Sequence, residues 1–180
     1  MTLPSPILAG FMSKVRLVRP KGFEPMSVKE ICSVSGCISE TPDVDPLWRY
    51  NDLGFCDSEQ TARDIITGDP NLYDMYAYEM FPFHCRDGEV KVIEVKLSLG
   101  QVPPGFDLVG YDIVTKANGS FFECSPLSCN GAGKWFKVNE YCLLDDEAYA
   151  YQVMLDMSAP DAHVEPGPYY LFKVYRKRPT

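Results

Sequence analysis

The chain has 180 residues and a formal net charge of −8, and 46% of its residues are hydrophobic and 23% charged. This balance is typical of a folded globular domain and excludes an intrinsically disordered chain. A chain of this length is most simply one domain that buries about 70% of its unfolded surface. The negative charge repels phosphate backbones, which excludes general nucleic-acid binding.

The sequence also indicates the compartment. No apolar run is long enough to span a membrane, so we expect no membrane partner. The first residues lack the positively charged segment that opens a secretory signal, and prolines interrupt their apolar stretch. These features predict a soluble, cytoplasmic protein. Its seven cysteines are then expected to be reduced, because disulfides persist mainly in oxidising compartments.

Residues 1–27 contain four prolines and are predicted to form an extended N-terminal arm, which leaves residues 28–180 as the domain. Residues 28–38 alternate weakly between polar and apolar side chains and are predicted as the first core strand. A long loop with two prolines follows. Because long loops in compact domains usually pack or function, we expect Trp48 and Phe55 to anchor this one.

The next elements are a helix and two strands. A helix is predicted to begin after Asp57, where Asp57 and Gln60 form a pattern typical of a capping box. An aromatic run over residues 73–83 is apolar on both faces, which predicts a central strand. Residues 90–99 alternate apolar with polar side chains and predict an additional strand.

The second half of the chain predicts a hairpin, a helix and a final strand. Residues 107–115 predict a strand that turns at an Asn-Gly pair into a return strand at 120–124. A helix is predicted to start at Asp145, and the last strand covers residues 169–177. The helix carries an apolar stripe that we expect to face the core, formed by Ala150, Val153, Met154 and Met157.

Two stretches of the chain, residues 48–66 and 136–154, resemble each other at a constant offset. Each follows a C-x4-C pair and precedes an aromatic strand. Self-similarity of this kind predicts a repeat architecture, and a chance match of common residue types is the alternative. The identical polar positions are Asn51 with Asn139 and Asp57 with Asp145.

The order of elements predicts an α+β fold of two strand–loop–helix–strand repeats, at about residues 28–83 and 106–177. With each helix crossing between strands, this is a ferredoxin-like split βαβ duplication, with both helices on one face of a mainly antiparallel sheet. The strand at 90–99 lies between the repeats, and a hairpin is added. Loops, the arm or a partner must cover the other face of the sheet.

The paired cysteines are candidate metal ligands. Four thiolates that the two repeats bring together could hold zinc tetrahedrally, although a spacing of four is looser than the usual two. The alternative is that they are buried side chains that act as small hydrophobic residues. Zinc is the one cofactor that the sequence suggests, and its candidate ligands are Cys32, Cys37, Cys124 and Cys129.

Cys124 or Cys129 is also a candidate nucleophile, because backbone amides in the Ser- and Gly-rich loop around them could bind an oxyanion. A thiol nucleophile needs a general base, and the chain has only two histidines, His84 and His163. No catalytic sequence signature supports this pairing. The histidines are otherwise ordinary residues of a loop and a strand end.

Aromatic residues in the predicted loops form a candidate interaction surface, since exposed aromatic clusters are typical of binding hot spots. The alternative, which is more common for a single aromatic residue, is that the side chain packs into the core. The candidates are Trp48, Trp135, Phe136 and Tyr141. For Asn51 and Asn139 we expect a structural role, in which the side chain bonds the loop backbone before each helix.

We interpret the chain as a non-enzymatic binding protein for a protein partner or a small ligand. An acidic inhibitor or immunity-type protein that binds a basic partner is one concrete version. The first alternative is a thiol-dependent enzyme that uses Cys124 or Cys129. The second is a structural zinc protein.

Overall fold

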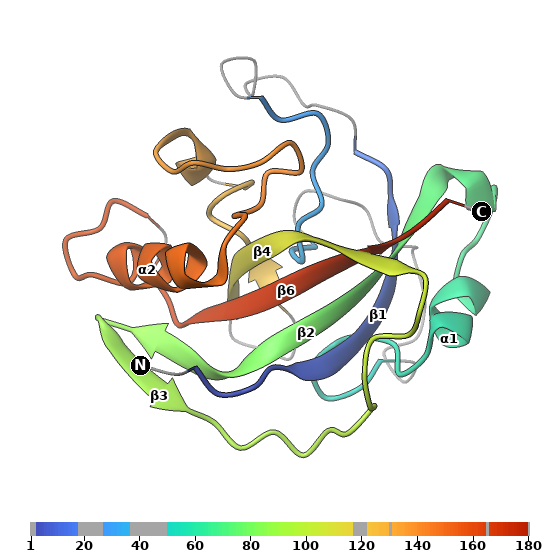
Figure 1. Cartoon of the computed structure of the whole chain (residues 1–180), viewed down its shortest axis with the longest axis horizontal. Coiled ribbons are helices and arrows are strands. Elements are labelled where there is room, and N and C mark those ends of the chain that lie inside the picture. Colours follow the sequence, from blue (N-terminus) through green and yellow to red (C-terminus); the bar gives the residue numbers. More distant parts are fainter. Residues whose placement is uncertain are drawn as a thin grey trace.

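The computed structural model describes residues 3–17, 27–36, 50–116, 122–129, 131–164 and 166–179. Its centre is an antiparallel sheet in the order β1-β2-β6-β4-β5, with a short strand, β3, also paired to β2 (Figure 1). The prediction of an α+β protein with a mainly antiparallel sheet is confirmed. The elements are β1 (Ile7–Val15), α1 (Glu59–Asp64), β2 (Tyr73–Arg86), β3 (Glu89–Val92), β4 (Phe106–Lys116), β5 (Phe122–Cys124), α2 (Glu147–Met157) and β6 (Tyr169–Lys177).

The middle of the sheet is formed by β2 and β6. Tyr78, Met80 and Phe172 are fully buried in one cluster, and Phe81 and Leu171 are buried in another. Each such side chain stabilises the fold by ~1.5–3 kcal/mol when it leaves water. The aromatic run predicted as a central strand is therefore confirmed as β2, and the last predicted strand is confirmed as β6.

The predicted arm is wrong over residues 7–15, because this segment forms β1. It pairs with β2 along its whole length, from Ile7 opposite Met80 to Val15 opposite Tyr73. Most of its side chains are buried. The first two prolines of the chain precede the strand, so they remove no hydrogen bond from the ladder.

The predicted first core strand at 28–38 is also wrong over its described part. Residues 27–36 form no strand, and their backbone bonds to a distant loop. The amides of Lys29 and Glu30 both donate to the carbonyl oxygen of Glu140. The segment therefore lies over the sheet as a loop.

Only the first residues of the predicted strand at 90–99 join the sheet. A turn at Asp87 and Gly88, both at positive φ, returns the chain from β2 into β3. β3 cannot extend past Val92 as a ladder strand, because β1 occupies the same edge of β2 as far as Met80. Ile93 still donates its amide to the carbonyl oxygen of Pro82 at 2.9 Å, and the chain then continues below the sheet in Figure 1 outside any strand.

α1 begins one residue later than predicted, and α2 begins two residues later. Ser58 caps α1 by accepting the amide of Thr61, and Asp146 caps α2 by accepting that of Tyr149. No helix in the described part of the chain is long and apolar enough to cross a membrane. The predicted core stripe of α2 is confirmed as buried, and it consists of Ala150, Val153, Met154 and Met157.

The helices pack against one face of the sheet, at opposite ends of β2. α1 contributes to a cluster with Met75 and Ala77, and α2 to a cluster with Phe81 and Phe83. These alternate residues of β2 share a face. Loops cover the other face of the sheet, which was one of the predicted alternatives. Their buried residues there include Cys32, Val34, Phe55 and Leu143.

The ferredoxin-like split βαβ arrangement is not confirmed. That arrangement places another strand between the two strands that flank a helix. Here β1 and β2, which flank α1, are antiparallel neighbours with no strand between them. Around α2, the strand β4 does lie between β5 and β6, so the arrangement does not occur twice. The prediction differed because it began the first half at residue 28 and so left β1 out of the sheet.

Candidate functional site

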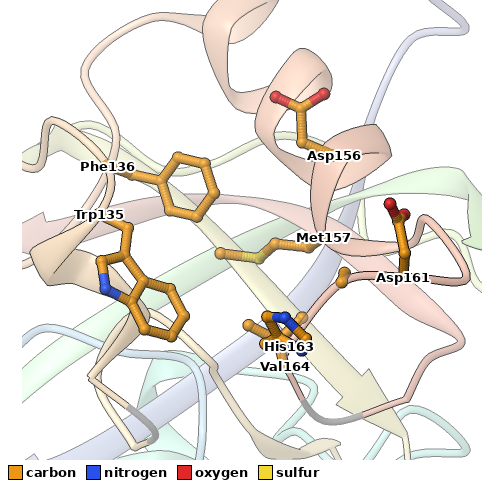
Figure 2. Close-up of a pocket in the computed structure, with 8 residues that line it drawn as sticks. Trp135, Phe136, Asp156, Met157, Asp161, His163 and Val164 are labelled. Atoms are coloured by element: carbon orange, nitrogen blue, oxygen red, sulfur yellow. The ribbon is translucent and has the colours of Figure 1, made fainter.

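A pocket opens between the end of α2 and the 3-10 turn Ala132–Lys134, and its volume is about 390 Å³. Figure 2 shows the rings of Trp135 and Phe136 on one side, the thioether of Met157 in the middle, and His163 beside Val164 at the lower edge. Met157 is buried and forms the floor. The lining is mainly apolar.

The rim of this pocket carries two carboxylates, Asp156 and Asp161 (Figure 2). Gln152 donates to Asp156 at 2.8 Å, and both acidic residues are exposed or nearly so. Trp135 leaves 65% of its surface exposed, although burial of an indole would be favourable. The pocket therefore combines an exposed aromatic edge, an apolar floor and negative charge.

The three predicted interaction residues that the structure describes do not form one surface. Trp135 and Phe136 line the pocket, whereas Tyr141 packs against the cluster on the other face of the sheet. Trp48 lies outside the described residues. The sequence did not predict Val164 as part of a site, because nothing in a loop sequence shows which helix end it approaches.

The predicted structural role of Asn51 is confirmed by four hydrogen bonds. Its Nδ2 donates to the carbonyl oxygen of Ala9 at 2.9 Å and to Asp57 at 3.0 Å. Its Oδ1 accepts the amides of Leu53 and Phe55. Both hydrogens and both lone pairs of the amide are then used, so none is left for a ligand.

Asn139 makes the same four hydrogen bonds in the second half. Its Nδ2 donates to the carbonyl oxygen of Val109 at 2.8 Å and to Asp145 at 2.9 Å. Its Oδ1 accepts the amides of Tyr141 and Leu143. Because Asp145 is held in this way, the cap of α2 falls to the next residue.

A glycine lies under each of these loops. Gly10 and Gly110 have φ of 141° and 147°. A Cβ atom on Gly10 would lie 2.5 Å from the carbonyl oxygen of Cys56, and one on Gly110 would lie 2.7 Å from the Cβ of Leu143. The strands and loops can approach this closely only where a side chain is absent.

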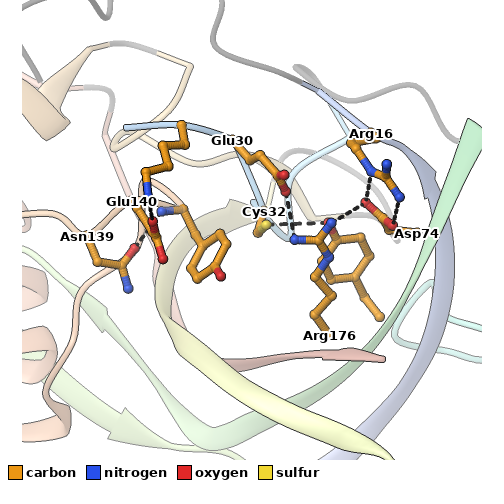
Figure 3. A network of polar contacts seen from close by, with 10 residues as sticks. Arg16, Glu30, Cys32, Asp74, Asn139, Glu140 and Arg176 are labelled. Atoms are coloured by element: carbon orange, nitrogen blue, oxygen red, sulfur yellow. Dashed lines mark hydrogen bonds and ion pairs between the residues drawn. The ribbon is translucent and has the colours of Figure 1, made fainter. Parts of the chain in front are cut away.

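Charged residues fasten the segment 27–36 to the end of the sheet (Figure 3). Arg176 of β6 bonds Glu30 at 2.7 Å and Asp74 at 2.9 Å, and Arg16 bonds the same aspartate at 2.8 Å. These hydrogen bonds lower the pKa of Asp74 against the effect of burial. The charged groups of this network are paired with one another, which indicates a structural role.

The buried Lys14 holds the next part of this segment. Its Nζ donates to the carbonyl oxygens of Ser33, Val34 and Ser35 at 2.7, 2.9 and 2.7 Å. A buried ammonium needs such partners, because an unpaired charge is costly to bury. The arrangement fixes the backbone that carries the Ser35 hydroxyl.

Asp112 of β4 is buried and accepts four hydrogen bonds. Ser125 Oγ at 2.6 Å and the amide of Ile113 bond one oxygen, and Ser33 Oγ and the amide of Val34, both at 2.8 Å, bond the other. Burial raises the pKa of Asp112 to about 6, although these donors favour the charged form. The sequence did not single out this residue.

The thiol of Cys129 lies at the junction of the two halves. Its Sγ is 3.4 Å from the Ser35 hydroxyl and 4.0 Å from that of Ser128. Hydrogen bonding from the Cys124 side chain, joined by these hydroxyls and the amide of Ser125, lowers the pKa of Cys129 to about 5. Cys129 is only partly buried.

The other predicted cysteine ligands have different surroundings. Cys32 is buried and accepts the Tyr76 hydroxyl at 3.4 Å, and burial raises its pKa to about 11. Cys124 is buried beside Cys129, and Cys37 lies outside the described residues. Within the part of the chain that the structure describes, no group of three His, Cys, Asp or Glu residues could hold a metal. Zinc binding that involves Cys37 stays a prediction.

The two histidines lie on different elements. His84 is on β2, where its ring is 5.6 Å from that of Tyr170, and burial lowers its pKa. His163 follows α2 and lines the pocket. The hydrogen-bond partners described for Cys129 are cysteine, serine hydroxyls and a serine amide, and neither histidine is among them.

Comparison of the chain with protein-family models, with curated proteins and with solved structures gave no significant match. The site itself therefore carries the functional argument. Among the residues that the structure describes, the pocket beside Trp135 and the thiol of Cys129 are the places developed below as candidates for binding and for chemistry.

Proposed function

We propose that the protein acts through this pocket as a binding protein, without catalysis in the pocket, and that the pocket receives a basic side chain, arginine or lysine, of a partner protein. The observation that carries this proposal is Trp135, which remains 65% exposed at the edge of an apolar pocket. Exposed tryptophans at a cavity edge are typical binding hot spots, because a partner desolvates a large area there.

The chemistry of the pocket favours a long side chain with a positive end. The aliphatic stem of arginine or lysine would pack between Trp135, Phe136 and the thioether of Met157. The charged end would then lie near Asp156 and Asp161. A cation over an aromatic face adds ~0.5–2 kcal/mol.

The charge of the whole chain supports the same class of partner. A net charge of −8 attracts a basic protein over the Debye length and raises its association rate. An acidic inhibitor or immunity-type protein is the form of binding protein that this combination fits best. Such binding would weaken as salt is added.

The test uses Nα-acetyl-arginine methylamide as a probe and the indole N–H resonances of the two tryptophans as reporters. The uncharged norleucine analogue and the glutamate analogue are matched probes. We expect the Trp135 resonance to shift with the arginine probe, less with norleucine and least with glutamate. Trp135→Phe assigns the resonance.

A control variant removes an exposed apolar residue elsewhere. Leu72 is 58% exposed and lies outside the pocket, so Leu72→Ala should bind the arginine probe as the natural chain does. Trp135→Ala lacks the reporter indole, so its binding is followed through the backbone amide resonance of Met157. It should bind the arginine probe at least about fivefold more weakly, which corresponds to ~1 kcal/mol. Equal shifts with all three probes, or unchanged binding by Trp135→Ala, would refute the proposal.

We also propose that the two halves are repeats of one unit, with limits that differ from those predicted. The proposal is supported by the matched hydrogen bonds of Asn51 and Asn139 and by the matched glycines Gly10 and Gly110. On these contacts the first repeat would begin with β1. The relation can be tested by the matched variants described in the Discussion.

A further inference from the structure

We propose that Cys129 and Cys124 form a reactive dithiol that reduces small hydroperoxides, with Cys129 as the attacking thiol and Cys124 as the resolving one. This activity goes beyond binding and does not depend on the pocket. The proposal stands on the turn that joins the two cysteines, on their unequal burial, and on the hydroxyl groups that surround the outer sulfur.

The turn between the cysteines brings their sulfur atoms together. β5 ends at Cys124, and the carbonyl oxygen of Ser125 then accepts the amides of Ser128 at 3.2 Å and of Cys129 at 2.7 Å. This folds the chain back on itself, and the Cys124 side chain hydrogen-bonds that of Cys129. The two thiols are therefore neighbours, as a disulfide between them requires.

Burial assigns the two roles. Cys124 is 7% exposed, whereas Cys129 is partly open to solvent. A reagent from solution therefore meets Cys129 first. Restricted access favours a small oxidant, and small hydroperoxides oxidise a thiolate to a sulfenic acid by two electrons.

The surroundings of Cys129 stabilise its thiolate without a histidine. Hydrogen bonds from Cys124, from the hydroxyls of Ser35 and Ser128, and from the amide of Ser125 hold its pKa well below the ordinary value. These donors come from both halves of the chain. A separate base is then not required to form the nucleophile.

Asp112 acts as a positioning residue for this cluster. One of its oxygens accepts Ser125 Oγ, at the start of the turn, and the other accepts Ser33 Oγ. Ser33 Oγ in turn accepts the amide of Ser35 at 3.0 Å. The buried carboxylate thus fixes both sides of the space around Cys129.

The dithiol reduces the hydroperoxide in two steps. The Cys129 thiolate attacks one oxygen of the hydroperoxide, an S–O bond forms, the O–O bond breaks, and the leaving alkoxide or hydroxide takes a proton from water. The Cys124 thiol then attacks the sulfenic sulfur of Cys129. An S–S bond forms, the S–O bond breaks, and water leaves with the Cys124 proton. Two equivalents of an external thiol then return the disulfide to the dithiol: the first opens the S–S bond as a mixed disulfide, and the second releases the protein thiol and leaves with the first as their own disulfide.

Other cysteines should not share this reactivity. Burial raises the pKa of Cys142 to about 12 and that of Cys32 to about 11, which keeps both as thiols at neutral pH. Their sulfurs are also shielded from solvent. They are internal controls in any labelling experiment.

The first test is the pH profile of iodoacetamide labelling, followed for each cysteine by mass spectrometry of the full chain. We expect the rate at Cys129 to rise to half its maximum near pH 5, whereas a free cysteine does so at about 8.5. Below pH 6 the labelling rate of Cys129 should exceed that of N-acetylcysteine about tenfold, because only Cys129 is then largely a thiolate. At neutral pH the two rates should be similar, because a thiolate of low pKa is a weaker nucleophile. A midpoint near that of a free thiol would refute the proposal, and this test needs no variant.

The second test uses hydrogen peroxide as the oxidant. The natural chain should lose two hydrogens in mass and show a Cys124–Cys129 disulfide on peptide mapping. Cys124→Ser should instead gain one oxygen at Cys129, trapped by dimedone, and Cys129→Ser should do neither. Trp135→Ala should behave as the natural chain, which separates this activity from binding. A disulfide mapped elsewhere, or unchanged oxidation in Cys129→Ser, would overturn the assignment.

Discussion

Asn51 and Asn139 make the same four hydrogen bonds in two loops that lie far apart in the sequence. Each amide ties a strand carbonyl, an aspartate and two loop amides together. The loop before each helix is therefore fixed by one side chain, and the helix can begin only where that side chain leaves a free cap.

We predict that Asn51→Ala and Asn139→Ala each lower the free energy of unfolding by ~2–4 kcal/mol, because buried partners lose their hydrogen bonds. Asn→Asp at either position should cost at least as much at pH 7, since an acceptor then faces Asp57 or Asp145. Urea unfolding measures both. Similar losses at the two positions would also support the repeat proposal.

The control for this prediction is Asn71. Its side chain bonds Asp69 on the surface, so Asn71→Ala should change the free energy of unfolding by no more than ~0.5 kcal/mol. If Asn51→Ala were as mild as Asn71→Ala, the four hydrogen bonds would not determine the loop.

The matched glycines give a second prediction. Gly10→Ala and Gly110→Ala place a methyl group within 2.7 Å of loop atoms, at a φ that side chains rarely adopt. We expect each to lower the free energy of unfolding by ~3 kcal/mol or more, as strain and overpacking add. Thermal and urea unfolding measure the loss.

Gly36→Ala is the matched control, because a Cβ there meets no atom within 4 Å. It should leave the free energy of unfolding nearly unchanged. A mild effect of Gly110→Ala would mean that the loop can move away from β4, contrary to the close approach described above.

Asp112 gives a prediction about pH. Its pKa is raised by burial to about 6, against about 3.9 in the unfolded chain. Between these values the folded state binds more protons than the unfolded state. The contribution of Asp112 to stability is therefore fully present below pH 4 and is lost as the pH rises through 6.

Asp112→Asn removes this titration. At pH 7 it should be less stable than the natural chain, because the Asn amide nitrogen faces two donors that now lack an acceptor. The stability difference between the two proteins should be larger at pH 4 than at pH 7. Urea unfolding at both values checks this, and a constant difference would contradict it.

The sequence predicted elements whose own pattern is long and strong. The central strand β2, the last strand β6 and the buried stripe of α2 were all correct in position. It missed β1, because prolines nearby suggested an arm and Gly10 weakens the strand pattern. It misplaced residues 28–38, since a loop that covers a sheet face is as apolar as a strand.

Strand order and side-chain proximity could not be predicted in the same way. The pairing of β1 with β2 decides where β3 ends, and no local pattern contains that competition. Cys129 was identified as a candidate nucleophile from its loop. The histidines were proposed as its base only because the chain has two of them, and a residue count does not show how far a histidine lies from the thiol. The buried role of Asp112 could have been suspected only from its position, because it is an acidic residue inside an otherwise apolar stretch of a predicted strand.

The last prediction separates the binding role of Trp135 from a folding role. Because Trp135 is 65% exposed, Trp135→Ala should change the free energy of unfolding by no more than about 1 kcal/mol. Met157 lies on the pocket floor and is only 3% exposed, so Met157→Ala should lower the free energy of unfolding by ~2–5 kcal/mol. Urea unfolding of both variants measures the contrast. A large loss for Trp135→Ala would show that the indole is retained to stabilise the fold, and its exposure would then no longer argue for a partner.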